Sequence, residues 1–322
     1  MRFLVTGGAG FIGSNFIRYI LQLYPNYKVI NLDCLTYAGN LKNLKDVEKN
    51  KNYKFIKGDI RNITLLKKLI KKIDILVNFA AQTHVDRSIK NSKEFIKTNI
   101  EGTWALLEVA RLTKNLKLFV QISTDEVYGS IQEGSFIETD PLNPSSPYAA
   151  SKAAADLLCN AYFVTYKVPT IIIRSTNNFG PHQFPEKIIP LFITNILENK
   201  KLPLYGDGLN TRNWIYVLDN VRAIDFLIHK GQAGEIYNVS SDEELTNLFI
   251  TEMILKKFNL DSSWIKYVKD RAGHDRRYSI DSTKLRSLGW KPIYDFEKSL
   301  EATIYWYKKN IDLWKRLKRK KF

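Results

Sequence analysis

The sequence predicts an α/β fold: a Rossmann-type, doubly wound parallel sheet with a smaller mixed C-terminal lobe. Three observations support this. The first half of the chain repeats one unit, a short β-branched run, a turn and a stretch of helical period, which is typical of a parallel sheet covered by helices. A glycine-rich turn follows the first run, and an aspartate ends the second. After about residue 174 the rhythm breaks into segments punctuated by proline and glycine, which indicates a change of architecture.

The repeating unit sets the expected elements. Strands are expected near residues 2–6, 28–32, 53–57, 74–78, 117–122 and 169–173, and helices near residues 11–24, 62–72, 92–113 and 147–167. The chain is expected to return to the sheet near residues 215–229 and 235–239, and to end in a helix near 296–317. We therefore expect a nucleotide-binding domain at 1–174, with returning segments near 214–239, and a substrate lobe at 175–213 and 240–322. Ligands of such sheets bind at the carboxyl ends of the strands.

Composition narrows the class of protein. With 44% hydrophobic and 25% charged residues, the chain of 322 residues is expected to be a soluble globular protein, and no apolar run approaches the ~20 residues that a bilayer requires. Residues 1–6 show no cleavable signal pattern, and Cys34 and Cys159 are too few for a disulfide framework, so a cytoplasmic protein is expected. The net charge of +16 comes from lysines spread over the chain, and the basic run at 315–321 is interpreted as a helix end. No nucleic-acid, membrane or metal partner is expected.

The glycine-rich turn carries the first functional signal. Residues 7–13, Gly-Gly-Ala-Gly-Phe-Ile-Gly, follow a predicted strand and open a predicted helix, so main-chain N–H groups can approach a pyrophosphate. Asp33 stands twenty residues after Gly13, at the end of the next strand, where a carboxylate accepts from both ribose hydroxyls and repels a 2′-phosphate. NAD is therefore favoured over NADP. Asp59-Ile60, after the third strand, either faces the adenine or caps the helix that begins at Arg61, and both interpretations stay open.

A tyrosine and a lysine at helical spacing carry the second signal. Tyr148 and Lys152 lie one turn apart, and only this pair among several with the same spacing begins a helix after a proline, Pro147. Lowering the pKa of a tyrosine from about 10 to about 7 requires roughly 4 kcal/mol, which an ammonium ~4 Å away supplies at an effective dielectric of ~20. The pair is therefore predicted to act as a base.

Paired carboxylates carry the third signal. Asp125 and Glu126 lie in the segment 122–129, directly after an apolar strand, where capping or a solvated loop would explain only one of them. Beside a Tyr/Lys pair we interpret them as acid and base, with one pKa raised by burial and by the charge of the other.

Five segments of the sequence resemble those of a known family. The segments GGAGFIG at 7–13, AAQTHVDRS at 80–88, STDEVYG at 123–129, YAASK at 148–152 and DRAGHDRRY at 270–278 are similar to those of dTDP-glucose 4,6-dehydratases, which belong to the extended short-chain dehydrogenase/reductase family. The likeness spans residues 2 to about 290. Its most specific part is Thr124-Asp125-Glu126, because related 4-epimerases lack this acid pair. Cys34 and Ala272 depart from the lysine and proline that are usual there.

The resemblance implies NAD as cofactor and a nucleotide sugar as substrate. The residues implied to line NAD are Gly7, Gly10, Phe11, Ile12, Gly13, Asp33, Cys34, Leu35, Thr36, Asp59, Ile60, Ala80, Ala81, Thr83, His84, Thr98, Tyr148, Lys152 and Asn178. Those implied to hold the substrate are His84, Ser88, Thr124, Asn177, Glu186, Lys187, Leu191, Pro203, Tyr205, Arg212, Asn247, Asp270, Arg271, His274, Arg276 and Tyr278. Arg212 and Arg276 also make independent sense, since guanidinium groups suit a pyrophosphate.

The implied reaction gives each catalytic residue a role. Tyr148 takes the O4 proton during oxidation at C4, Glu126 removes the C5 proton, Asp125 protonates the departing C6 hydroxyl, and Thr124 holds O4. The alternatives are a UDP-glucose 4,6-dehydratase or an NAD-dependent 4-epimerase, and, in another class, a catalytically silent NAD sensor. The family also implies a homodimer in which helices 92–113 and 147–167 pair, where this chain has the apolar residues Trp104, Leu107, Leu157 and Leu158. Ordinary packing on their own sheet is the alternative for that stripe.

Overall fold

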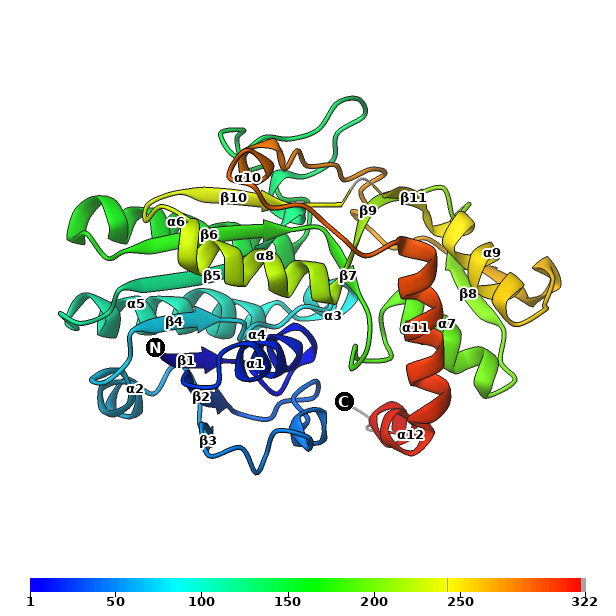
Figure 1. The fold of residues 1–322 in the computed structure, drawn as a ribbon. Coiled ribbons are helices and arrows are strands. Elements are labelled where there is room, and N and C mark those ends of the chain that lie inside the picture. The colour runs from blue at the N-terminus through cyan, green and yellow to red at the C-terminus, as the bar shows by residue number, and fades with distance from the viewer. Residues whose placement is uncertain (242, 320–322) are drawn as a thin grey trace.

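The main sheet has seven parallel strands. A computed structural model describes residues 1–241 and 243–319, and its sheet has the order β10-β6-β5-β4-β1-β2-β3 (Figure 1). The strands are β1 (Arg2–Thr6), β2 (Lys28–Asp33), β3 (Tyr53–Lys57), β4 (Ile75–Asn78), β5 (Leu118–Thr124), β6 (Thr170–Ser175) and β10 (Ile236–Val239). The six predicted strands are confirmed, and the expected return of the chain forms the seventh, parallel to β6.

Helices cover both faces of this sheet because consecutive side chains of its strands, which point to opposite faces, are apolar. Phe3 and Val5 of β1 pack into the cluster that contains α1 (Phe11–Leu23) and α8 (Val217–Lys230). Leu4 faces the opposite cluster, with residues of α2 (Ile63–Ile70), α5 (Gly102–Arg111) and α6 (Pro147–Tyr166). β1 pairs with β2 on one side and with β4 on the other, so the strand order reverses there. This is the point at which ligands of doubly wound sheets bind.

The helix expected over 92–113 is confirmed, and it contains a π-helical segment. After the separate short helix α3 (Val85–Lys90), the segments α4 (Lys93–Phe95), η2 (Ile96–Glu101, π-helical) and α5 follow one another without a break. Asn99 of the π segment accepts a hydrogen bond from Gln82 N (2.8 Å) and donates to Gln82 O (3.0 Å) and to Ser151 Oγ (2.8 Å). The extra residue in this turn therefore anchors the loop after β4.

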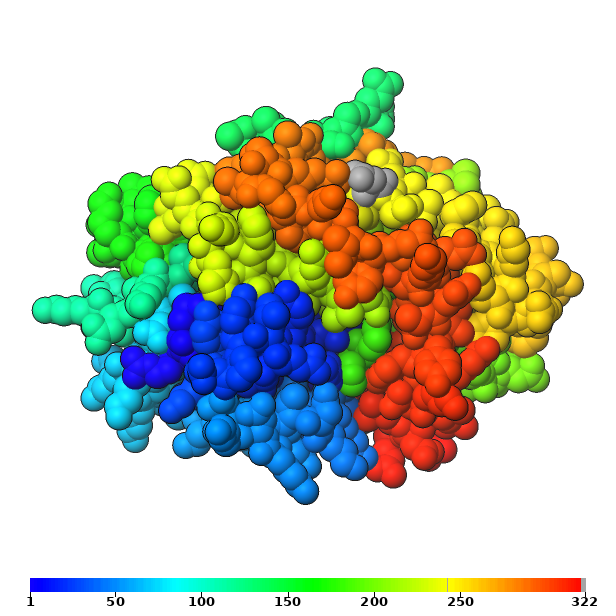
Figure 2. Space-filling model, in the orientation of Figure 1, coloured from blue at the N-terminus to red at the C-terminus, as the bar shows by residue number. Residues whose placement is uncertain are grey.

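The C-terminal helix is divided. The expected helix near 296–317 consists of α11 (Phe296–Lys309) and α12 (Ile311–Arg319), which are separated at Asn310. The indole of the buried Trp314 donates to Tyr307 O (2.8 Å), and this contact links α12 to α11. In Figure 2 these helices, in red, adjoin the blue N-terminal elements. The basic run expected at the end of this helix continues α12 as far as Arg319, and its Lys320 and Lys321 lie outside the described residues.

A smaller set of elements packs beside the main sheet. A mixed sheet joins β7 (Asn177–Phe179), β9 (Thr211–Tyr216) and β11 (Glu244–Thr246), and β8 (Leu202–Tyr205) pairs with β12 (Ile265–Val268). The remaining helices and short 3-10 segments are η1 (Leu41–Leu44), η3 (Asp125–Tyr128), α7 (Ile188–Leu197), α9 (Asn247–Lys257), η4 (Ser262–Trp264) and α10 (Thr283–Ser287). One hydrophobic cluster runs from the main sheet into these elements. Among the described residues, no helix has the length and apolar character needed to cross a membrane.

Candidate active site

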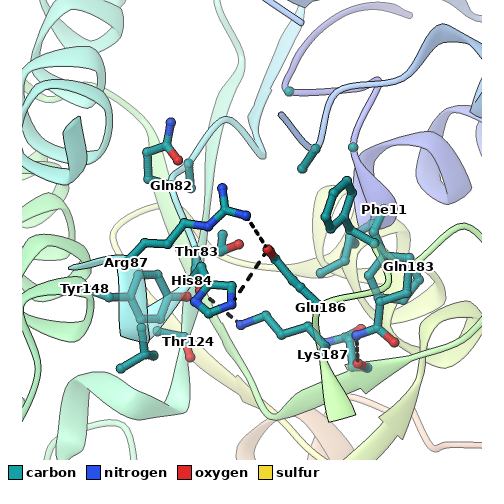
Figure 3. Close-up of a pocket in the computed structure, with 18 of the residues that line it drawn as sticks. Phe11, Gln82, Thr83, His84, Arg87, Thr124, Tyr148, Gln183, Glu186 and Lys187 are labelled. Carbon is teal, nitrogen blue, oxygen red and sulfur yellow. Dashed lines mark hydrogen bonds and ion pairs between the residues drawn. The ribbon is translucent and has the colours of Figure 1, made fainter. Parts of the chain in front are cut away.

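A large cavity lies at the carboxyl ends of the main strands. Its volume is about 810 Å³, and its lining combines the turn after β1, the ends of β4 and β5, the start of α6 and residues of the smaller elements. Figure 3 shows side chains from these segments pointing into it. The cavity therefore lies where the predicted motifs converge.

The glycine turn has the shape that a dinucleotide requires. Gly7 has φ +68°, and a Cβ there would lie 2.6 Å from Ala80 N. At Gly13 a Cβ would lie 2.7 Å from the carbonyl oxygen of Gly7. Gly10 is the N-cap residue of α1, and it has no side chain that could occupy the first N–H groups of the helix. Because side chains at these positions would fill the turn, the glycines leave its main-chain N–H groups open to a phosphate.

The carboxylate of Asp33 is fixed at the end of β2. It accepts hydrogen bonds from Ala9 N (2.9 Å) and Leu35 N (2.8 Å), and burial raises its pKa above the ordinary value. Asp59 accepts from Arg61 N (2.8 Å) and pairs with the Arg61 guanidinium (2.7 Å). The interpretation of Asp59 as helix cap is wrong, because Asn62 caps α2 by accepting from Leu65 N.

The acid pair lies in the turn η3, directly after β5. Asp125 is 2% exposed, and Thr124 Oγ1 donates to its Oδ1 (3.1 Å). Burial, and next the charge of Glu126, raise the pKa of Asp125 to about 7. Glu126 and Thr124 line the cavity, whereas Asp125 lies behind them. Near neutral pH the pair therefore contains one carboxyl that holds a proton.

Tyr148 and Lys152 stand at the start of α6. Pro147 begins this helix, and Ser146 caps it by accepting from Ala149 N (3.1 Å). Both side chains are buried and line the cavity, and Lys152 Nζ donates to Ile122 O (2.5 Å).

The pKa of Tyr148 is raised in the structure, whereas the spacing to Lys152 predicted that it would be lowered. Burial, followed by the charge of Glu126, raises the pKa of Tyr148 well above its ordinary value, and a hydrogen bond with Thr124 offsets only part of this. The prediction that Lys152 alone makes Tyr148 a base near pH 7 is therefore wrong. That prediction took the positive charge of Lys152 into account. It left out the burial of the phenol and the nearby carboxylates of Asp125 and Glu126, which raise the pKa of Tyr148.

Glu186 is the centre of a second polar group in the cavity (Figure 3). It accepts from Tyr37 OH (2.9 Å) and from the Arg87 guanidinium (3.0 Å), and His84 Nε2 lies 3.7 Å away. Burial, and next the charge of Lys187, lower the pKa of His84 to about 4, so its ring is neutral at pH 7. Lys187 Nζ donates to Thr83 O (3.0 Å). Arg87 was not predicted as a site residue, although it lies within the segment 80–88.

Arg212 and Arg276 have different environments. Arg212 is buried on β9, donates to the main-chain carbonyls of Thr211 (2.7 Å) and Asp275 (2.8 Å), and lies 4.1 Å from the centre of the Tyr278 ring. These carbonyls do not neutralise its charge, so it can receive an anion. Arg276 is exposed, pairs with Asp207 (2.8 Å) and does not line the cavity.

Most other predicted residues line the cavity. Those that do so are Gly7, Gly10, Phe11, Ile12, Gly13, Asp33, Cys34, Thr36, Asp59, Ile60, Ala80, Ala81, Thr83, His84, Thr98, Asn177, Asn178, Glu186, Lys187, Leu191, Pro203, Tyr205, Asn247, Arg271, His274 and Tyr278. Leu35, Ser88 and Asp270 do not line it. Leu35 N instead donates to Asp33, Ser88 Oγ accepts from Tyr148 N (3.2 Å), and Asp270 pairs with His274 (2.6 Å). These three therefore orient residues that do line it.

Several lining residues were not predicted, among them Gln82, Gln183, Phe184 and Trp214. Gln82 lies within a quoted motif, but the other three carry no local signal. Within residues 1–241 and 243–319, no group of three or more His, Cys, Asp or Glu side chains is arranged to hold a metal ion.

A dinucleotide-type sheet whose cavity joins a Tyr/Lys pair on one helix defines the class of extended short-chain dehydrogenases/reductases. The family model described as GDP-mannose 4,6 dehydratase matches residues 4–303. The chain belongs to this family, and within it resembles the dTDP-glucose 4,6-dehydratases.

Individual relatives are similar to this chain over nearly its full length. The low-salt glycan biosynthesis protein Agl12 of Haloferax volcanii is 51% identical over 95% of this chain and 98% of its own. A dTDP-glucose 4,6-dehydratase of Streptomyces niveus is 47% identical over 99% of this chain and 96% of its own. The crystal structure of the dTDP-glucose 4,6-dehydratase DesIV from Streptomyces venezuelae, which has NAD bound, superposes with a TM-score of 0.96 at 48% identity, covering 98% of this chain and 100% of that one. The predicted fold and family are thereby confirmed.

Proposed function

We propose that this protein is an NAD-dependent enzyme that converts dTDP-glucose to dTDP-4-keto-6-deoxyglucose. The reaction oxidises C4, eliminates water across C5 and C6, and reduces C6. The observation that carries the proposal is the pair Asp125 and Glu126, one of which holds a proton near neutral pH, beside Tyr148 in a cavity that also has a dinucleotide turn. The similarity to dTDP-glucose 4,6-dehydratases over nearly the whole chain supports the same function.

The residues of the first three strand ends would hold NAD. The open turn at Gly7–Gly13 would bind the pyrophosphate, and Asp33 would accept from the adenosine ribose. When bound, NAD supplies a positively charged nicotinamide ring that takes up the C4 hydrogen with its electron pair and later returns it to C6. Cys34 and Thr36 line the adenosine end, where the charge of Arg61 is already paired with Asp59. A 2′-phosphate would therefore meet the Asp33 carboxylate.

Tyr148 would remove the O4 proton, and Thr124 would donate a hydrogen bond to O4. Because burial and the acid pair raise the pKa of Tyr148, its deprotonation depends on positive charge supplied at the site. Lys152 provides one such charge from the same face of α6.

Glu126 and Asp125 would carry out the elimination. Glu126 lines the cavity and would take the C5 proton, after which the C5–C6 double bond forms and the C6–O bond breaks. The departing hydroxyl takes the proton of Asp125 and leaves as water, so the atoms balance. Asp125 has its proton available up to about pH 7, since burial and Glu126 raise its pKa to that value.

The nucleoside diphosphate would lie along the smaller elements. We propose that residues 175–213 and 240–322 form the substrate lobe and that residues 1–174, with 214–239, form the NAD domain. The buried Arg212, which donates to main-chain carbonyls, supports a diphosphate position next to it. Arg271, His274 and Asn247 also line the cavity.

We also propose a homodimer formed through α5 and α6. Trp104 is 40% exposed and Leu157 60% exposed on these helices, which supports an apolar contact surface. Leu107 is buried and Leu158 packs on the chain's own core, so these two belong to ordinary packing. A cytoplasmic location is supported by two cysteines that are both free, Cys34 and Cys159.

The test is an incubation with dTDP-glucose and, separately, with UDP-glucose, with the products identified by mass spectrometry. The proposal predicts a 4-keto-6-deoxy product that loses one water relative to the substrate, formed faster from dTDP-glucose. A hexose inverted at C4 without loss of water would identify a 4-epimerase, a reaction in which Asp125 and Glu126 have no catalytic role. Faster turnover of UDP-glucose would reassign the nucleotide.

A further inference from the structure

A buried ion pair lies beneath the catalytic residues. Asp156 on α6 is 1% exposed and Arg174 on β6 is 3% exposed, and Arg174 Nε donates to Asp156 Oδ2 at 3.0 Å. Ser123 Oγ donates to the same oxygen (2.9 Å). None of these three residues has a role in the proposed reaction. A buried ion pair is also weak evidence that the fold gains stability from it.

On one side the pair is linked to the helix that carries Tyr148 and Lys152. Asp156 lies one turn after Lys152, on the same face of α6. The strand β5 contacts this helix through two consecutive residues, since Ile122 O accepts from Lys152 Nζ (2.5 Å) and Ser123 Oγ donates to Asp156. The side chains of Lys152 and Asp156 are thus fixed by neighbouring residues of one strand.

On the other side the pair is linked to the turn that carries Asp125 and Glu126. Arg174 NH1 donates to Tyr128 OH (2.7 Å), and its guanidinium carbon lies 4.7 Å from the centre of that ring. Tyr128 is the last residue of η3 and is itself fully buried, and its hydroxyl donates to Asn238 Oδ1 (2.9 Å). Arg174 therefore joins the two elements that carry the catalytic residues, α6 through Asp156 and η3 through Tyr128.

We propose that Asp156 and Arg174 are positioning residues for the dehydration. Their ion pair fixes α6 and η3 relative to each other, and the Asp156 carboxylate maintains the positive charge of Lys152. This inference rests on the proposed function, because it gives the pair a purpose only if Tyr148 and the acid pair act on one substrate.

The electrostatic role of Asp156 follows from the charges around Lys152. Burial lowers the pKa of Lys152, and the charge of Asp156 opposes this. The other groups that face the cluster are Arg174 on β6, Cys159 on α6, Tyr128 at the end of η3, and Glu138, whose main-chain oxygen accepts from Arg174 (3.5 Å). Removing the carboxylate should lower the pKa of Lys152 further, and removing the guanidinium should raise it.

The alternative is that the pair only stabilises the fold. The chain offers a matched control for this, because Asp219 on α8 is also a buried carboxylate with an arginine partner, Arg222 (2.6 Å), and accepts main-chain hydrogen bonds from Ile293 and Tyr294. It lies on the opposite face of the main sheet from α6. Asp219→Asn should therefore destabilise the protein without changing the titration of Lys152.

The first experiment measures the titration of Lys152 directly. The parent, Asp156→Asn, Arg174→Met, the double variant and Asp219→Asn are treated with a small acylating reagent at a series of pH values, and the modified peptide is quantified by mass spectrometry. The proposal predicts a midpoint for Lys152 lower by roughly one pH unit in Asp156→Asn, higher in Arg174→Met and close to the parent in the double variant. Coinciding midpoints in all five proteins would overturn the electrostatic role. No substrate is needed, so this result is independent of whether the proposed function holds.

The second experiment tests the mechanical link and uses a variant that keeps the fold. Tyr128→Phe retains the ring that stacks on Phe136 (5.1 Å) but loses the hydroxyl that receives Arg174. The proposal predicts an unchanged KM in steady-state assays. In single-turnover runs with dTDP-glucose it predicts unchanged C4 oxidation but elimination slowed roughly 10- to 100-fold, with 4-keto hexose accumulating. Equal slowing of both steps, or no slowing, would contradict the link. A parent that forms no 4-keto-6-deoxy product would instead refute the proposed function.

Discussion

Replacing Asp125 by asparagine should stabilise the fold while it stops the dehydration. Burial, and next the charge of Glu126, raise the pKa of this carboxyl from 3.8 to about 7. Between these values the unfolded chain has released a proton that the folded chain still holds, so stability falls as pH rises. A shift of about 3 units corresponds to roughly 4 kcal/mol at most, lost between about pH 4 and pH 7.

Asparagine has no such titration, so the variant keeps this free energy. Its Oδ1 can accept from Thr124 Oγ1 as the carboxyl does (3.1 Å). Urea unfolding of parent and variant should give similar free energies near pH 4 and a variant more stable by about 2–4 kcal/mol near pH 8. Asp219→Asn serves as the control and should destabilise at both pH values. A difference between Asp125→Asn and the parent that is the same at both pH values would refute the reasoning, because it would mean that Asp125 titrates normally.

Three further outcomes follow from the site. Tyr148→Phe should bind NAD and fold like the parent, yet lose about 10²–10⁴-fold in turnover, since it removes the base while keeping the buried ring; a near-parental rate measured by product formation would assign the base elsewhere. Cofactor titration by intrinsic fluorescence should give tighter binding of NAD than of NADP, and Asp33→Asn should narrow this difference; equal affinities in the parent would contradict the role of Asp33. Light scattering at micromolar concentration should give the mass of a dimer, and Leu157→Glu, which alters a side chain 60% exposed on α6, should shift it toward a monomer; a parent that is already monomeric would exclude the dimer.

The features that the sequence could predict are the local ones. Each strand of the nucleotide-binding half is bounded by its own turn residues, and the glycine turn and Asp33 lie within two consecutive units of the chain. The same holds for Tyr148, whose helix begins at Pro147 and is capped by Ser146. Short-range chemistry determines these elements, so their positions followed from spacing alone.

The features that the sequence could not predict depend on distant partners. Arg276 pairs with Asp207, 69 residues earlier, and this contact keeps it out of the cavity. The π segment within the helix expected over 92–113 depends on hydrogen bonds that Asn99 makes with Gln82 and Ser151.

The electrostatics of Tyr148 were mispredicted for a related reason. The spacing to Lys152 is visible in the sequence, whereas the burial that raises the pKa of the phenol, and its proximity to Glu126, appear only when α6 packs beside the end of β5. A sequence shows which charges are available, but the loss of water around them depends on tertiary packing.

A turnover of dTDP-glucose in heavy water would decide whether this protein is a dehydratase, with the mass of the product and the position of its label determined by mass spectrometry. We expect a 4-keto-6-deoxy sugar nucleotide that carries one solvent deuterium at C5, because Glu126 removes the C5 proton and that carbon is later reprotonated. Recovery of an unlabelled hexose inverted at C4, or of a dehydrated product without deuterium at C5, would contradict it.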